Sequence, residues 1–205
     1  MARHGFASQG GRFAGLAACC AVLLAGCDVA QTGRIRSIAI LDGAVTAAAP
    51  AGYCISPGAG MRGEDSAVIL MGRCSGGPSA TAAPAVITLS VGPAGSAGVM
   101  AGGGENLSAY FQSEAGRAAL SREGRAADVR VLAATGTDTT FVLHVADNAT
   151  GEYWRAFRGL RGRLATVSVT GSAEAPLTSA QSRSVLEATL GALATANREA
   201  AQPPA

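Results

Sequence analysis

The chain has 205 residues, of which 48% are hydrophobic, and a formal net charge of +2 at pH 7. All fourteen Asp and Glu residues follow residue 27, whereas two of the sixteen arginines precede it. If residues 1–26 are removed, as argued below, 179 residues with no net charge remain, which is enough for one domain with a hydrophobic core. A neutral balance argues against nucleic acid as a partner, because nucleic-acid binding needs a basic face.

The first 26 residues have the pattern of a bacterial signal peptide. Arg3, His4 and Arg12 form a basic start without acids, and an apolar run follows at residues 13–26. This run is too short to cross a bilayer as a helix, which takes roughly 20 residues, and fits a signal-peptide core. We therefore expect residues 1–26 to be a targeting segment that is not part of the fold.

The apolar run ends in Leu24-Ala25-Gly26-Cys27, which resembles the lipobox of bacterial lipoproteins. The resemblance implies a diacylglyceryl thioether on the Cys27 sulfur and an acyl chain such as palmitate on the new amino terminus, and two or more chains anchor a protein stably. The alternative is ordinary secretion of a soluble product. Asp28 resembles a signal for retention in the inner membrane, which favours that membrane for a protein facing the periplasm.

Two cysteines remain for the folded domain. Cys19 and Cys20 lie in the leader and Cys27 is the lipidation site, which leaves Cys54 and Cys74. In the oxidising envelope we expect this pair to form a structural disulfide. The alternative, a redox-active pair, would need the close C-x-x-C spacing that lowers a thiol pKa, and the spacing here is twenty residues.

Residues 35–200 are predicted to form one α+β domain, between a lipidated tether at residues 27–34 and a disordered tail at residues 201–205. Strands are expected at residues 35–41, 44–49, 53–55, 66–73, 85–91, 129–134, 141–146, 153–157 and 164–170. The last four are joined by turn sequences, which predicts an antiparallel meander. A turn is expected after residue 55, at Ser56-Pro57.

A middle helix is expected from Glu105 on. Leu107, Tyr110 and Phe111 follow the helical spacing and share one face, so the two aromatic residues are expected to anchor the core. A break is expected at Gly116. The preceding Gly- and Ala-rich stretch at residues 92–104 is long for a loop in a compact domain, which is typical of a mobile or functional segment.

A second helix is expected near the C-terminus. Thr178 and Gln181 have the spacing of a capping box, and Leu186, Leu190 and Leu193 form an apolar stripe over the following turns. An apolar stripe on one side of a helix has to pack against another element, which we expect to be the sheet. Together these elements predict an antiparallel sheet with a middle helix and a C-terminal helix packed on it.

The string GAGMRG at residues 58–63 has the form of a dinucleotide-binding loop, G-x-G-x-x-G. That function requires a strand before the glycines, a helix after them and an acidic residue about twenty positions further on. Here Pro57 precedes the string, a strand-like run follows at residues 66–73, and residues 80–86 contain no acid. We interpret the string as a chance match, and no cofactor is predicted.

His144 is the only histidine after the leader, so any zinc site or histidine base must use it. It lies on a predicted strand, with Asp138 and Asp147 in the flanking turns. The sequence has no G-x-S-x-G or H-E-x-x-H motif, but a Ser/His/Asp triad can assemble from distant residues. A structural role for His144 is favoured over a hydrolase built on it. We assign no catalytic residue and no metal ligand.

The densest group of charges surrounds Trp154 and consists of Arg155, Arg158, Arg161 and Arg163. Guanidinium groups pair with planar anions and stack on aromatic rings, so this segment is a candidate contact for an anion or a partner. The alternative is a solvated strand face. Alternation along the strand sends Trp154 and Arg155 to opposite faces, which favours burial of Trp154 against the last helix.

Five short segments resemble small envelope lipoproteins of alphaproteobacteria. They are GYCISP at residues 52–57, GRC at 72–74, LSREG at 120–124, WRAF at 154–157 and AN at 196–197. The order of strands and helices also resembles, more distantly, the PsbP-like α/β/α sandwich, which implies a non-enzymatic accessory protein of a membrane complex. Fold alone does not determine function.

These observations favour a membrane-anchored periplasmic lipoprotein that acts as a non-catalytic accessory or binding module of a cell-envelope complex. Its expected partners are the membrane, through the lipid, and an envelope protein. The alternative is a carrier of a small ligand or lipid, with a cavity between helix and sheet and residues 92–104 as its mouth. An internal apolar cavity would favour the carrier.

Lipidation predicts the chemistry of the mature amino terminus. Mass spectrometry of protein purified from membranes is expected to find a terminal peptide that begins at Cys27 and carries the mass of a diacylglyceryl group and an acyl chain. The Cys27→Ser variant is expected to leave the membrane fraction, because it lacks the acceptor sulfur. An unmodified terminus in the native protein would contradict the lipobox interpretation.

Overall fold

The computed structural model describes residues 34–75, 82–137 and 139–198. The predicted signal peptide, Cys27, Asp28 and the tail at residues 201–205 lie outside the described residues, as does Asp138.

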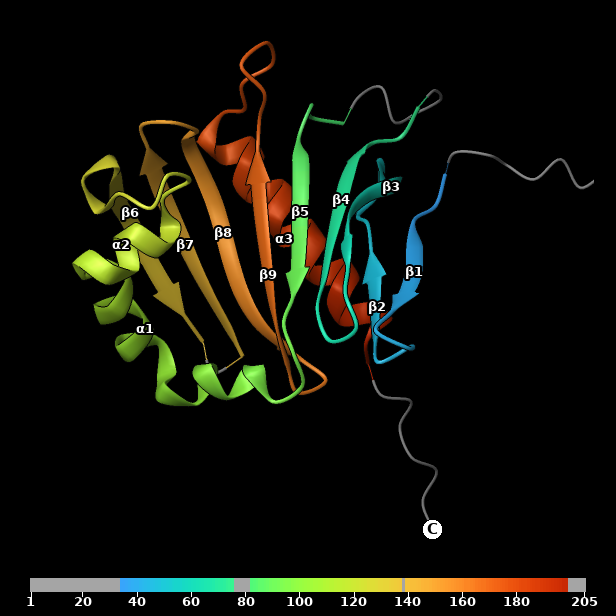
Figure 1. Cartoon of the computed structure of the whole chain (residues 1–205). Helices are drawn as coiled ribbons and strands as arrows, with labels where there is room; N and C mark the ends of the chain where they lie inside the picture. The colour runs from blue at the N-terminus through green and yellow to red at the C-terminus, as the bar shows by residue number, and fades with distance from the viewer. Residues whose placement is uncertain (1–33, 76–81, 138, 199–205) are drawn as a thin grey trace, which may run out of the picture. The chain divides into compact units, whose positions relative to one another are not determined.

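Nine strands of the described residues form two antiparallel sheets (Figure 1). The smaller sheet is a hairpin of β1 (Ser37–Ile40) and β2 (Val45–Ala48). The larger one consists of β3 (Tyr53–Arg62), β4 (Ala67–Arg73), β5 (Val86–Val91), β6 (Val129–Gly136), β7 (Thr140–Asp147), β8 (Gly151–Leu160) and β9 (Arg163–Thr170). Its strand order is β3-β4-β5-β9-β8-β7-β6, so β6 to β9 form the predicted meander.

The helices lie on opposite faces of the larger sheet (Figure 1). On one face, α1 (Gly103–Gln112) and α2 (Glu114–Leu120) pack on β6, and the 3₁₀ helix η2 (Ser96–Gly102) packs on β8 and β9. On the other face, α3 (Ser179–Ala196) packs on β8, β9 and β2. A short 3₁₀ turn, η3 (Ala126–Asp128), precedes β6. The structure confirms the predicted α+β class with a middle and a C-terminal helix on the sheet.

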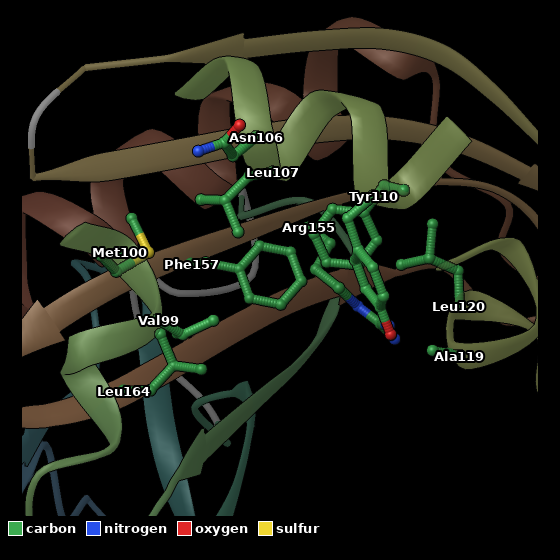
Figure 2. Close-up of a pocket in the computed structure, with 11 residues that line it drawn as sticks. Val99, Met100, Asn106, Leu107, Tyr110, Ala119, Leu120, Arg155, Phe157 and Leu164 are labelled. Atoms are coloured by element: carbon green, nitrogen blue, oxygen red, sulfur yellow. The ribbon is translucent and has the colours of Figure 1, made fainter. Parts of the chain in front are cut away.

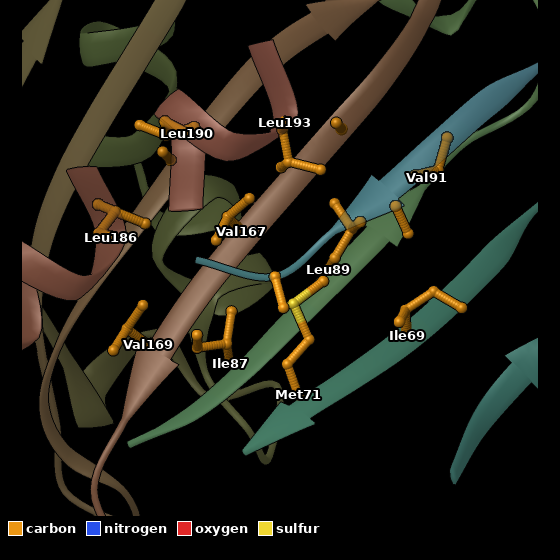
Figure 3. Packing of buried hydrophobic residues seen from close by; sticks show 14 of the residues in the cluster. Ile69, Met71, Ile87, Leu89, Val91, Val167, Val169, Leu186, Leu190 and Leu193 are labelled. Carbon is orange, nitrogen blue, oxygen red and sulfur yellow. The ribbon is translucent and has the colours of Figure 1, made fainter. Parts of the chain in front are cut away.

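Each helical layer has its own hydrophobic cluster. Alternation along β9 turns Ala165, Val167 and Val169 toward α3, where they meet Leu186 and Leu193 (Figure 3). The opposite cluster joins α1 and α2 to β6, β7 and β8, and it consists of Leu107, Phe111, Leu120, Val129, Phe141, Leu143, Val145 and Tyr153. Strand β8 contributes side chains to both clusters, because both helical layers reach it.

The C-terminal helix begins as predicted. The Gln181 N–H donates to the Thr178 hydroxyl at 3.2 Å, and the Thr178 N–H donates to the Gln181 side-chain oxygen at 2.9 Å. This capping box satisfies two amide groups that a helix start otherwise leaves without partners. The predicted stripe of Leu186, Leu190 and Leu193 is buried.

The middle helix breaks at Ser113, so the predicted break at Gly116 is wrong. The Ser113 hydroxyl caps α2 by accepting from the Gly116 N–H at 3.1 Å. Gly116 lies inside α2, where a Cβ atom would come within 1.9 Å of the Tyr110 carbonyl oxygen. The glycine therefore allows α2 to approach α1 closely. The expectation that two aromatic residues anchor the core holds for Phe111, whereas Tyr110 is 47% exposed.

The string at residues 58–63 lies at the end of β3 and does not open a helix, and the predicted turn at Ser56-Pro57 is also part of that strand. The pairing of β3 with β4 shifts register between Ile55 and Gly60. Gly60 has φ of 100°, and a Cβ there would lie 2.1 Å from the Val68 carbonyl oxygen. The glycine serves this β-bulge, which explains the string without a nucleotide.

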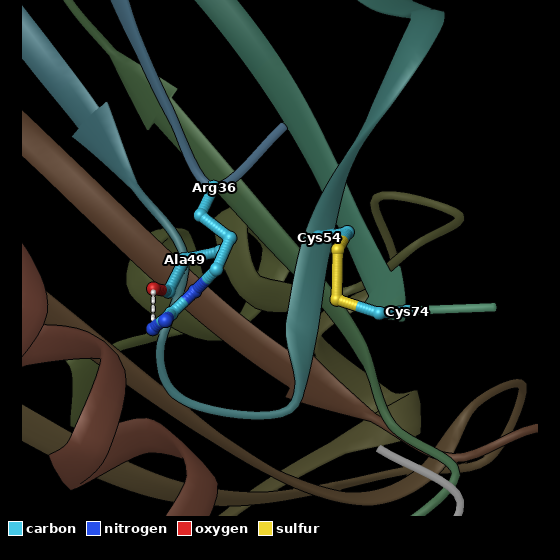
Figure 4. Close-up of a disulfide and its surroundings, with 4 residues drawn as sticks. All are labelled: Arg36, Ala49, Cys54 and Cys74. Atoms are coloured by element: carbon cyan, nitrogen blue, oxygen red, sulfur yellow. Dashed lines mark hydrogen bonds between the residues drawn. A yellow bond between two sulfur atoms is a disulfide. The ribbon is translucent and has the colours of Figure 1, made fainter. Parts of the chain in front are cut away.

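The predicted disulfide joins Cys54 to Cys74, with 4.9 Å between their Cα atoms (Figure 4). It links the edge strand β3 to the end of β4, and both residues are buried. Close by, the Arg36 guanidinium donates to the Ala49 carbonyl at 3.5 Å across the β1–β2 hairpin (Figure 4). The bridge closes a loop that contains the residues connecting the two strands.

Loss of this bridge is expected to destabilise the domain. The Cys54→Ala/Cys74→Ala variant should lose about 3 kcal/mol of unfolding free energy, because the open chain gains entropy when unfolded. Urea denaturation measures the change, and reduction of the wild type should reproduce it. Equal stability of the oxidised wild type and the double variant would contradict a structural role for the bridge.

Candidate ligand-binding site

A pocket of about 480 Å³ lies between the helical layer of η2, α1 and α2 and strands β8 and β9 (Figure 2). Its walls are mostly apolar and come from five elements. Val99 and Met100 belong to η2, Leu107 and Phe111 to α1, Leu120 to α2, Phe157 to β8, and Leu164 lies on β9. The volume falls within the range of small-molecule sites, roughly 300–1,000 Å³.

Aromatic stacking makes one wall of this pocket rigid. The rings of Phe111 and Phe157 stack with 4.9 Å between their centroids, and Phe141 stacks on Phe111 at 5.9 Å. At the rim, the side chains of Val99 and Tyr110 are about half exposed. The pocket therefore has a fixed apolar interior and an apolar mouth partly formed by η2.

One charged side chain, Arg155, lines the pocket. Alternation along β8 places Tyr153, Arg155 and Phe157 on the face toward α1 and α2. The Arg155 Nε–H donates to the hydroxyl of Ser168 at 2.8 Å. Ser168 is the residue opposite Arg155 in the pairing of β8 with β9. The guanidinium carbon lies 5.2 Å from the centre of the Tyr153 ring. Within the described part of the chain, the two terminal amino groups of Arg155 have no recorded acceptor.

Tyr153 supports Arg155 from the buried side. Its hydroxyl donates to the Leu120 carbonyl at 3.0 Å. Burial raises the pKa of Tyr153, and the nearby Arg155 charge offsets part of that rise. The ring therefore stays neutral at physiological pH and presents its face to the guanidinium.

The wall formed by η2 is held to the sheet by Arg163. Its Nη1 group donates to the Asp65 carboxylate at 2.8 Å and to the Gly92 carbonyl at 3.1 Å. The next residue, Leu164, donates its N–H to the Ser96 hydroxyl at 2.8 Å. These contacts hold Gly92, which precedes η2, and Ser96, the first residue of η2. The start of the stretch at residues 92–104, predicted as the mouth of a cavity, is therefore fixed to β9.

The four arginines near Trp154 do not form one surface. Arg155 faces the pocket, whereas Arg158 lies three positions along β8 and points to the opposite face. Arg161 is exposed in the β8–β9 turn, and Arg163 is bound to Asp65. The expected cluster therefore separates into one pocket residue, one structural clamp and two residues elsewhere.

Trp154 is buried against the last helix, as predicted. Its Nε1–H donates to the Ser179 hydroxyl at 3.0 Å, and the residue is 8% exposed. The Arg183 guanidinium lies 5.1 Å from the ring centre. On this face of β8, Trp154 and Ala156 pack in the hydrophobic cluster under α3.

His144 stacks on Trp154 at 4.4 Å, on the face of the sheet opposite the pocket. Its Nε2 atom lies 3.4 Å from the Ser179 hydroxyl and 3.3 Å from the Glu152 carboxylate. A catalytic relay needs the acid at Nδ1 and the nucleophile at Nε2. Here both groups meet the same nitrogen, so this arrangement is not a relay. Among the described residues, no group of His, Cys, Asp and Glu is gathered that could hold a metal ion.

Several pocket residues were not predicted as site residues from the sequence. Val99 and Met100 lie in the glycine-rich stretch whose length alone suggested a function. Ala119 and Leu164 gave no signal, because their place in the pocket depends on how α2 and β9 meet in space. Arg155 was predicted as a possible contact for an anion or a partner, but the pocket that it lines was not predicted.

No family model matches the chain, and no curated protein matches it. One solved structure to which the chain is weakly similar is that of a point mutant of the protein Mog1. It has 12% sequence identity and a TM-score of 0.40, and the match covers 78% of this chain and 93% of that one. No helix in the described ranges is both long and apolar enough to cross a membrane.

The clamp at Arg163 gives a pH-dependent prediction. The hydrogen bond from Arg163 holds the pKa of Asp65 below its ordinary value of about 3.9. The carboxylate therefore contributes stability above about pH 4 and loses that contribution as the pH falls through its lowered pKa. The melting temperature of Asp65→Asn should lie slightly below that of the wild type at about pH 7, and the gap should close in stronger acid.

The matched control is Glu64→Gln, which removes a neighbouring exposed charge with no recorded ion pair among the described residues. Thermal denaturation followed by circular dichroism, from strong acid to neutral pH, measures both variants. A gap for Asp65→Asn that is constant with pH would contradict the assigned role of the carboxylate.

Proposed function

We propose that the domain is a non-catalytic binding module that holds a small amphiphilic anion in the pocket between η2, α1, α2 and the sheet. One observation carries the proposal: Arg155 lines a mostly apolar pocket, and its two terminal amino groups have no acceptor among the described residues. A ligand with an apolar chain and an anionic head group would complement both parts of this pocket.

The charge on Arg155 favours an anionic head group. A guanidinium against apolar walls loses solvation, and an ion pair compensates for that loss only if the geometry is good. The Nε–H bond to Ser168 and the Tyr153 ring fix the plane of the group before any ligand arrives. A preorganised guanidinium binds a planar or tetrahedral anion with little further loss of entropy.

The apolar walls of the pocket favour a ligand with a hydrocarbon chain. Burial of each methylene group contributes about 0.8 kcal/mol, so a chain of several carbons in the pocket would add substantial affinity. Phe111 and Phe157 supply a preformed surface, which avoids the cost of reorganising the protein. The site lies on the face of the sheet opposite His144, which supports binding over hydrolysis.

The expected lipid anchor at Cys27 is part of this proposal. A tethered module would work next to a bilayer, where single-chain amphiphiles are concentrated. Of the three functions considered from the sequence, the small-ligand or lipid carrier is therefore favoured. An accessory role in an envelope complex stays compatible with it, because a binding module can deliver its ligand to such a complex.

Binding of dodecanoate below its critical micelle concentration tests the proposal. Isothermal titration calorimetry should detect binding to the oxidised wild-type domain. Arg155→Ala should weaken it roughly ten- to hundredfold, because a charge-assisted hydrogen bond contributes about 1.5–3 kcal/mol. Ala119→Trp should abolish it, because this exposed position lines the pocket and the indole would fill it.

The matched control is Thr195→Trp, which introduces the same indole at an exposed position on α3. It should bind dodecanoate like the wild type. Circular dichroism spectra of all variants check that the fold is retained. Full affinity in Ala119→Trp would overturn the proposed function, as would failure of the wild type to bind both dodecanoate and dodecyl phosphate.

A further inference from the structure

Arg155 also lines a second hollow, of about 220 Å³, next to the apolar pocket. The two share Ala119, Leu120 and Arg155, so the guanidinium stands at their boundary. A ligand whose chain fills the first pocket and whose head reaches Arg155 would place that head in or beside the second hollow. The lining of this hollow therefore bears on the head group.

The second hollow is lined mainly by polar side chains. Ser168 and Thr170 of β9 supply hydroxyl groups, and Thr150 adds another from the β7–β8 turn. Arg122, an exposed residue just after α2, also lines the hollow, and its side chain carries a second guanidinium. Two arginines from different elements thus line one small space, Arg155 from strand β8 and Arg122 from the segment after α2.

The acid that lines the hollow does not neutralise these cations by an ion pair. Asp147 is 3% exposed, and its carboxylate accepts from the Ala149 N–H at 2.7 Å and from the Arg122 N–H at 3.1 Å. The carboxylate therefore holds the backbone of residue 122 in place. The next acid, Glu123, pairs with Arg125. Within the described ranges, no ion pair is recorded for the Arg122 side chain.

The number of donors favours one kind of anion. A carboxylate has two oxygens, which a single guanidinium can bind through parallel hydrogen bonds. A phosphate monoester carries three outer oxygens and close to two negative charges, which suits two guanidinium groups and neighbouring hydroxyls. We infer that the ligand is a single-chain phosphate monoester, with its chain in the apolar pocket and its phosphate between Arg155 and Arg122. This inference rests on the proposed function.

Three probes with the same chain separate the contributions: dodecyl phosphate, dodecanoate and dodecanol, each below its critical micelle or solubility limit. The wild type should bind dodecyl phosphate at least tenfold more tightly than dodecanoate, and dodecanol most weakly. Arg122→Ala should weaken dodecyl phosphate about tenfold and change dodecanoate less than twofold. Arg125→Ala, which removes a neighbouring arginine that does not line the hollow, should change neither.

Inorganic phosphate is the fourth probe and separates a lipid from a soluble phosphate. It should bind at least a hundredfold more weakly than dodecyl phosphate, because it lacks the chain. Equal affinity of the wild type for dodecyl phosphate and dodecanoate would overturn the phosphate assignment. So would an Arg122→Ala variant that still prefers dodecyl phosphate to dodecanoate as strongly as the wild type does. Either result would leave the proposed function intact. Tight binding of inorganic phosphate would also overturn the phosphate assignment. Failure of all three amphiphiles to bind would overturn the proposed function itself.

Discussion

The structure depends on one constraint: a seven-stranded sheet has two faces to cover, and its helices cover different parts of them. On one face α1 and α2 pack on β6, and on the other α3 packs on β8 and β9. The two layers overlap at β8, which contributes side chains to both hydrophobic clusters. On the first face the helical layer ends above β8 and β9, and the apolar pocket lies at that edge.

The alternation of side chains along β8 turns this edge into a site. Trp154 and Ala156 pack toward α3, while Tyr153, Arg155 and Phe157 point toward the edge of the opposite layer. A register shift of one residue would reverse this arrangement and bury the arginine under α3. The antiparallel pairing with β7 and β9 fixes the register, and hydrogen bonds to the β9 strand hold η2 over the pocket. Fold and site therefore follow from the same strand pairing.

The sequence predicted the features that depend on local patterns. The capping box at Thr178, the strand alternation and the disulfide all arise from short spacings or from cysteine pairing, and each was confirmed. Features set by contacts between distant segments were missed. The exposure of Tyr110, for example, depends on where the helical layer ends. Likewise, Arg155 could be named as an anion contact, but its pocket depends on η2 and α2 meeting β9. The break at Ser113 is a local exception that was also missed, because the Ser113 hydroxyl caps α2 through the Gly116 N–H.

The most direct test of the account is to locate a bound chain in solution. A fatty acid with a nitroxide on its chain should broaden the methyl resonances of Leu107 and Leu120, which line the pocket, in a spectrum of the leucine-labelled domain. The resonances of Leu186 and Leu193, buried on the α3 side of the sheet, should be broadened clearly less, because they lie further from the label. Broadening confined to the α3 side, or equal broadening on both sides, would contradict the account.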